Sequence, residues 1–168
     1  MHALYLVSVW LHILAATAWI GGMFFLVLVV VPWLRSGGRR DASTFLRETG
    51  VRFRKVGWIC FGVLVATGTL NLWFRGIGFA DLAQAEWRAS PFGRILAWKL
   101  GVFAVVLIVS ALHDFYVGPH AARVIGAGPD TAEAARARRR ASLLGRANML
   151  LALVLVAVGV MLVRGAPL

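Results

Sequence analysis

The chain is poor in residues that cross-link a fold or ligate soft metals. It has one cysteine among 168 residues, Cys60, so an internal disulfide and any metal motif built on paired cysteines are excluded. Its methionines do not form the paired pattern of a copper-binding methionine ladder; they are Met1, Met23, Met149 and Met161. Acidic residues are also few, because seven Asp and Glu stand against 18 Lys and Arg, which gives a formal net charge of +11.

Charged residues are absent from the whole stretch between Tyr5 and Trp33. The chain is 60% hydrophobic, and about 20 apolar residues are enough to cross a bilayer, so the sequence indicates an integral membrane protein. The arginines lie between apolar runs, so membrane topology explains the basic charge, and no nucleic-acid partner is expected. The N-terminus lacks a basic region followed by a short apolar core and a cleavage site, so we expect the first apolar segment to be retained as a helix.

Four apolar runs are long enough to span a membrane, at about residues 5–33, 56–74, 95–117 and 148–163. Helices satisfy their own backbone groups in lipid, so the fold class predicted is all-α, an integral membrane four-helix bundle forming a single transmembrane domain over residues 1–168. Small residues in these runs are expected where helices approach closely, at Gly21, Gly22, Gly62, Gly68, Gly101 and Gly159.

The connections between the runs differ in charge. The first and third are strongly basic, and the second has only Arg75, Arg88 and Arg94 beside Asp81 and Glu86. The positive-inside rule then predicts that connections one and three are cytoplasmic and that the N-terminus and C-terminus lie outside. The basic residues are Arg35, Arg39, Arg40, Arg47, Arg52, Arg54 and Lys55 in the first connection, and Arg123, Arg136, Arg138, Arg139, Arg140 and Arg146 in the third.

Two connections are expected to be partly helical. The second has the composition of a short interfacial helix, with Trp87 and Trp98 suited to the outer headgroup belt. In the third, Thr131–Arg140 is predicted to continue as a helix into the fourth span, with its arginines facing solvent or lipid headgroups.

An outer polar group is predicted from the depth of each residue, at a rise of about 1.5 Å per residue. His12 in the first span and Lys99 in the third fall at one level, roughly 10 Å from the middle of the membrane toward the outside, and Asn71 and Thr67 of the second span lie near them. Intramembrane histidine usually faces a bundle interior and has a function. The alternatives are that His12 serves packing alone and that Lys99 extends its amine to the surface.

An inner polar group is predicted at the other end of the spans, roughly 20 Å from His12 along the membrane normal. It comprises His113, Asp114, Arg146 and Asn148, with His120 and Arg54 near them. His12 and His113 are both candidate metal ligands, but their separation excludes two axial bonds to one haem. The alternatives are an interfacial ion pair of Asp114 with an arginine and a helix-bridging role for Asn148.

These residues carry a resemblance to a known family. Leu11-His12, the run Trp19–Met23 and Pro32 resemble the first helix of copper-resistance-D (CopD) membrane domains. Ala66-Thr67-Gly68 resembles the second helix, and Leu112–Phe115 with Pro119 resembles the end of the third. Arg146 with Asn148 resembles the start of the fourth. The resemblance implies copper handling at the bacterial inner membrane, with a periplasmic copper protein as a partner.

A related resemblance is to HemJ, a membrane protoporphyrinogen oxidase family that binds haem b. His12, Lys99-Leu100, His113 and the pair Arg146 and Asn148 match that pattern, and the sequence departs from it at Leu26–Leu28 and Met149. The resemblance implies haem b in the bundle and quinone as the electron acceptor.

Three hypotheses for function follow. The first is a CopD-like inner-membrane protein that binds haem b or a metal ion inside the bundle, in copper handling or membrane redox. His12 would be a ligand, with Lys99 as a second ligand or as a cation beside a propionate. The second is a HemJ-like protoporphyrinogen IX oxidase, which would make the chain a haem-dependent oxidoreductase. The third is a non-catalytic accessory subunit, and the sequence leaves an oligomer open. Imidazole fits haem iron well, whereas soft Cu(I) favours sulfur, so donor chemistry and family resemblance point in different directions.

Overall fold

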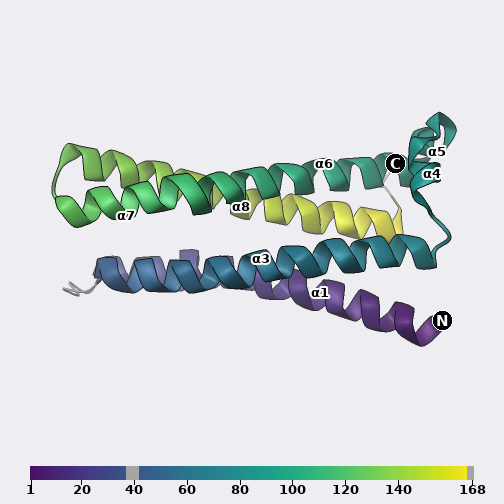
Figure 1. Ribbon diagram of the computed structural model, residues 1–168, viewed down its shortest axis with the longest axis horizontal. Helices are drawn as coiled ribbons and strands as arrows, with labels where there is room; N and C mark the ends of the chain where they lie inside the picture. Colours follow the sequence, from purple (N-terminus) through teal and green to yellow (C-terminus); the bar gives the residue numbers. More distant parts are fainter. Residues whose placement is uncertain (37–41, 166–168) are drawn as a thin grey trace. The chain divides into compact units, whose positions relative to one another are not determined.

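The computed structural model describes residues 1–36 and 42–165, and these fold into helices with no strand among them. The chain divides into two compact units, Met1–Ala83 and Gln84–Leu168. The first unit contains α1 (His2–Phe25), the π-helical turn η1 (Leu26–Val30), α2 (Val31–Ser36), α3 (Ala42–Phe74) and the short α4 (Phe79–Ala83). Helix α1 packs along α3, so this unit is a helical hairpin (Figure 1).

The second unit is built on the same plan. It contains α5 (Ala85–Ala89), α6 (Pro91–Leu112), the π-helical turn η2 (His113–Val117), α7 (Gly118–Ala127) and α8 (Ala132–Arg164). Both α6 and α7 pack against α8, which makes a second helical hairpin (Figure 1). Ser90 caps α6 by accepting a hydrogen bond from the Gly93 backbone N–H, and Thr131 caps α8 in the same way from Ala134.

The prediction of four membrane-crossing helices is confirmed. The apolar helical segments long enough to cross are His2–Trp33, Glu48–Phe74, Pro91–Ala127 and Ala132–Arg164. Each helix runs beyond the apolar run that predicted it, because arginine- and alanine-rich sequence at the basic ends continues the helix at little cost. The predicted continuation of Thr131–Arg140 into the fourth span is confirmed by α8, and the predicted helix in the second connection by α4 and α5.

The π-helical turns occupy equivalent positions in the two hairpins. Pro32 follows η1 at the second position of α2, and Pro119 follows η2 at the second position of α7. Proline has no N–H and clashes with the carbonyl one turn back, so a wider turn just before it relieves the helix. His12 lies 20 residues before Pro32, and Lys99 lies 20 residues before Pro119, so each has the same register within its own hairpin.

The core of the first hairpin is aromatic. Trp19 is 3% exposed, and its ring packs edge-on against Phe61 with centroids 4.9 Å apart. Rings also lie against glycines of the facing helix: a Cβ on Gly57 would stand 3.7 Å from the Trp19 ring, and one on Gly22 would collide with the Phe53 ring. A methyl group at Gly22 would therefore displace the Phe53 ring from its place against α1.

The glycine prediction is confirmed at two positions, and at four others the described residues show no such contact. Gly22 and Gly68 face side chains across the α1–α3 interface. A Cβ built at Gly21, Gly62, Gly101 or Gly159 would have no atom of the described residues within 4 Å, apart from those of its chain neighbours and of its own helix backbone. Glycine is common in membrane helices for more than one reason, so its presence in an apolar run does not by itself mark a contact.

The second hairpin is held by small residues where α7 meets α8. Ala121 of α7 is buried, as are Ala134 and Ala137 of α8, and Val106 of α6 and Ala152 of α8 are fully buried. Small side chains let the helix backbones approach closely.

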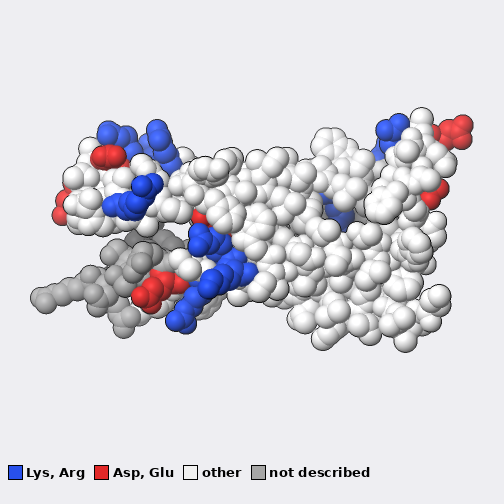
Figure 2. All heavy atoms as spheres, viewed as in Figure 1, with Lys and Arg blue, Asp and Glu red and all other residues white. Residues whose placement is uncertain are grey.

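Basic atoms lie mainly at the end of this hairpin formed by α7 and the start of α8, whereas the surface over α6 is almost entirely uncharged (Figure 2). The positive-inside prediction used this concentration of arginine in the third connection. The location of both termini on the outside of the membrane stays a prediction. Arg39 and Arg40 of the first connection lie outside the described residues.

Enlarging the buried Ala134 tests the α7–α8 packing. Ala134→Leu should destabilise this end of the hairpin by about 1–3 kcal/mol, because a fully buried alanine leaves no room for three more carbon atoms. The arginine-rich start of α8 is a natural substrate for trypsin, so cleavage there should quicken by roughly 5- to 150-fold. Ala135→Leu, which adds the same group at an exposed neighbouring position, should leave the cleavage rate unchanged. Equal cleavage of both variants would show that the small-residue packing is not required.

Candidate functional site

His12 is held by a side chain from the facing helix of its own hairpin. Its Nδ1 lies 2.8 Å from the hydroxyl oxygen of Thr67, which is 5% exposed on α3. The sequence placed both residues in the outer polar group, and the structure brings these two together. A polar contact of this kind between two apolar helices fixes the rotation of each about its axis.

The hydrogen bonds of Thr67 decide which nitrogen of His12 carries the proton. A hydroxyl has one hydrogen, and Thr67 donates it to the Val63 carbonyl at 2.6 Å. The Thr67 oxygen must therefore accept from His12, so Nδ1 is the protonated nitrogen. In the neutral imidazole, Nε2 then carries the lone pair, which is the form in which a histidine binds a metal.

Two further residues fix the position of the Thr67–His12 pair. Ser8, one turn before His12 on α1, donates its hydroxyl to the Thr67 carbonyl at 3.3 Å and is 5% exposed. A Cβ on Gly68 would lie 3.5 Å from His12 Cε1, so the imidazole edge rests on the α3 backbone. Sequence reasoning missed Ser8, although its spacing of four residues from His12 on one helix face could have indicated it.

Asn71 lies one turn beyond Thr67 on α3, as predicted. Its side-chain oxygen is buried and has no hydrogen-bond partner among the described residues. A buried carbonyl oxygen without a donor is uncommon in native proteins and usually indicates a water, an ion or a ligand at that point. The oxygen is an acceptor, so it suits a bound group that carries an N–H or O–H.

Lys99 lies on α6 in the second hairpin and is half-buried. Its spacing to the proline after the π-helical turn equals that of His12 in the first hairpin. The equal depth of the two residues stays a prediction. The meeting of the two side chains stays a prediction.

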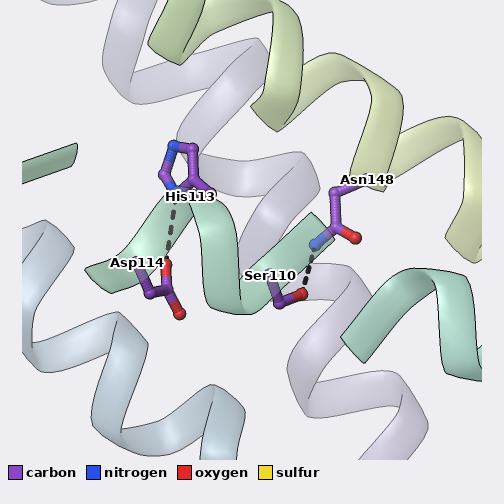
Figure 3. A network of polar contacts seen from close by, with 4 residues as sticks. All are labelled: Ser110, His113, Asp114 and Asn148. Atoms are coloured by element: carbon purple, nitrogen blue, oxygen red, sulfur yellow. Dashed lines mark hydrogen bonds and ion pairs between the residues drawn. The ribbon is translucent and has the colours of Figure 1, made fainter. Parts of the chain in front are cut away.

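Two polar contacts lie at the other end of the second hairpin, around η2 (Figure 3). The Asn148 amide donates to the Ser110 hydroxyl at 3.0 Å, and both residues are buried. His113 Nδ1 lies 3.1 Å from the Asp114 carboxylate, with the two side chains 36% and 21% exposed. A carboxylate beside Nδ1 accepts a hydrogen bond from the Nδ1–H, so Nε2 carries the lone pair of neutral His113 as well.

Two further residues of the predicted inner group are exposed. Arg146 is exposed on α8, and His120 is exposed on α7. Ser110 is a member that sequence reasoning missed. Its signal was weak, because a serine in an apolar run commonly bonds only to its own helix backbone.

The side chains that could ligate a metal are dispersed. Among the described residues, no group of three or more His, Cys, Asp and Glu side chains is close enough to enclose an ion. In each hairpin, one histidine has its Nδ1 in a polar contact and offers only Nε2 to a metal. A bound metal would therefore need further donors.

Comparison with known proteins decides the family. The model of copper resistance protein D matches residues 47–162, which is more than half of the chain. The chain belongs to the CopD family. The matched region includes Thr67, Asn71, Lys99, His113 and Asn148, whereas His12 precedes it. CopD membership confirms the resemblance found in the sequence and agrees with a multi-pass protein of the bacterial cytoplasmic membrane.

Two curated relatives are similar to this CopD-family chain. An uncharacterised protein of Aquifex aeolicus (strain VF5) is 35% identical over 151 residues, which is 89% of both chains. Copper transport protein CutJ of Bacillus subtilis (strain 168) is 30% identical over 103 residues, which is 61% of this chain but 17% of CutJ. No solved structure matches the chain.

Removing the Thr67 hydroxyl tests the tautomer of His12. In Thr67→Val the hydrogen bond to Nδ1 is lost, and a net hydrogen bond of about 0.5–1.5 kcal/mol corresponds to a roughly 2- to 10-fold shift toward the Nε2–H form. Nitrogen-15 NMR of labelled histidine measures this ratio directly. Thr69→Val is the matched control, because the exposed Thr69 hydroxyl bonds the Val65 carbonyl of its own helix. A wild-type His12 already protonated at Nε2 would contradict the assignment.

Proposed function

We propose that this CopD-family protein handles copper by binding the ion at Nε2 of His12, inside the first hairpin. The observation that carries the proposal is the Thr67 hydroxyl, which is committed to Val63 and so fixes the His12 proton on Nδ1. Placing an imidazole in an apolar membrane helix costs free energy, so such a residue usually has a function. A neutral imidazole held in one orientation by a hydrogen bond at its other nitrogen is the usual form of a metal-ligating histidine. CopD membership and the similarity to a copper transport protein support copper as the cargo.

One imidazole does not complete a copper site. Imidazole nitrogen is an acceptable donor for copper in either common oxidation state, but at least one more donor is needed. Lys99 is the proposed second donor, and it ligates only as a neutral amine. The buried Asn71 oxygen lies one turn from Thr67 and would accept a hydrogen bond from a ligating amine or water.

His113 is proposed as a second copper ligand, at the opposite end of the membrane crossing. Asp114 beside its Nδ1 would orient Nε2 and make it a stronger donor. The dyad lies in η2, and π-helical turns are frequent at functional sites because they redirect side chains. Copper bound at His12 and copper bound at His113 would mark two stages of passage across the membrane.

Haem b was the alternative ligand in the sequence hypotheses. The edge of the His12 ring lies against Gly68, which supports a fixed orientation of the imidazole. This contact does not favour a porphyrin over a copper ion as the ligand. The HemJ-like oxidase and the accessory subunit likewise gain no specific support from the described contacts. Copper is therefore the function proposed, and a visible spectrum of the isolated protein tests haem in the same preparation.

Copper titration of the purified protein in detergent, against a coloured Cu(I) chelator, tests the proposal. His12→Ala should remove one bound copper or weaken its binding by at least about tenfold, and Thr67→Val should weaken it by roughly 10- to 100-fold. His120→Ala removes an exposed histidine of α7 and should change neither stoichiometry nor affinity.

Unchanged copper binding in His12→Ala would contradict the site. A haem absorption band in the wild type that disappears in His12→Ala would show that His12 ligates haem instead of copper. Loss of folding is excluded as a cause when the variant keeps the wild-type gel-filtration volume and unfolding temperature.

A further inference from the structure

The turn between α5 and α6 borders a shallow cavity, open to the surface, that the copper proposal does not use. The cavity has a volume of about 330 Å³ and is lined by Arg88, Arg94, Ala97 and Trp98. Arg88 comes from the short α5, and the other three residues come from the first eight residues of α6. Basic atoms are visible at the surface over α5 in Figure 2.

The two arginines bring uncompensated charge to this cavity. A guanidinium is always protonated, and neither Arg88 nor Arg94 forms an ion pair with any residue that the structure describes. Glu86 is the acidic residue of α5, and it too is exposed and makes no ion pair within the described ranges. Two cations on one small cavity favour an anion that both can bind.

The position of the cavity on α6 and its residue Trp98 suggest that the bound anion belongs to a membrane surface. Helix α6 begins at Pro91 and belongs to the apolar segment Pro91–Ala127, so the cavity lies where a membrane crossing starts. Trp98 is 71% exposed one turn after Arg94. Exposed tryptophan close to arginine at the end of a membrane helix is typical of the level of lipid headgroups.

We propose that this cavity binds the phosphate of an anionic phospholipid headgroup. The guanidinium forks of Arg88 and Arg94 would each donate hydrogen bonds to the non-bridging phosphate oxygens. The Trp98 ring would pack against the glycerol and the first methylenes of the acyl chains. A lipid occupies the site better than a soluble anion, because Trp98 and Ala97 extend the cavity from the charged end onto an apolar helix face.

Binding of dihexanoyl phosphatidylglycerol below its micelle concentration, measured by titration of the purified full chain, tests the site. The double variant Arg88→Gln with Arg94→Gln should bind at least about tenfold more weakly, since both charge-assisted contacts are lost. Arg164→Gln removes an exposed arginine at the end of α8 and should bind as the wild type does. Trp98→Ala should weaken the lipid while leaving any response to inorganic phosphate unchanged.

Two further ligands separate the sources of the phosphate. Inorganic phosphate should bind much more weakly than the lipid, and dihexanoyl phosphatidylcholine should bind more weakly because its choline cation meets two arginines. Inorganic phosphate that binds as tightly as the lipid would overturn the lipid assignment. Equal lipid binding by the double glutamine variant would overturn the site, and neither result affects copper binding at His12.

Discussion

The hydroxyl of Thr67 is the group on which the account of the first hairpin depends. It donates to the Val63 carbonyl and accepts from His12, while the backbone carbonyl of the same residue accepts from Ser8. Each of these bonds is made in an apolar environment, where an unmade one would be costly. Together they hold α1 at one rotation against α3 and fix the proton of His12, so the packing of the hairpin and the chemistry of the site have one cause.

The shared plan of the two hairpins gives this site a context. Each hairpin has a long apolar helix, a π-helical turn, a proline two residues later and a final long helix of 33 residues. The two histidines occupy different positions within their hairpins. His12 lies well before the π-helical turn η1, whereas His113 is the first residue of η2. Each hairpin of this CopD-family chain therefore contains one histidine with a hydrogen-bonded Nδ1, at a different point of the shared plan.

Much of the fold could be predicted because membrane helices follow from length and apolarity alone. Counting residues along antiparallel helices also placed His12 and Thr67 in one polar group, although it did not predict that their side chains bond to each other. Ser8 and Ser110 could not be predicted, because a hydroxyl in an apolar helix bonds equally well to its own backbone or to a neighbour. The π-helical turns were not predicted, and Pro119 was expected to close the third helix, whereas the helical path continues through it into α7. The pairing of His12 with Lys99 depends on how the two hairpins meet, which counting along each helix does not determine.

Copper K-edge X-ray absorption of the copper-loaded protein is the most direct measurement of the central claim. We predict nitrogen scattering at about 2 Å with the outer-shell pattern of an imidazole ring, reduced in the His12→Gln protein. A spectrum of sulfur scatterers alone near about 2.3 Å, identical in the wild type and in His12→Gln, would contradict it.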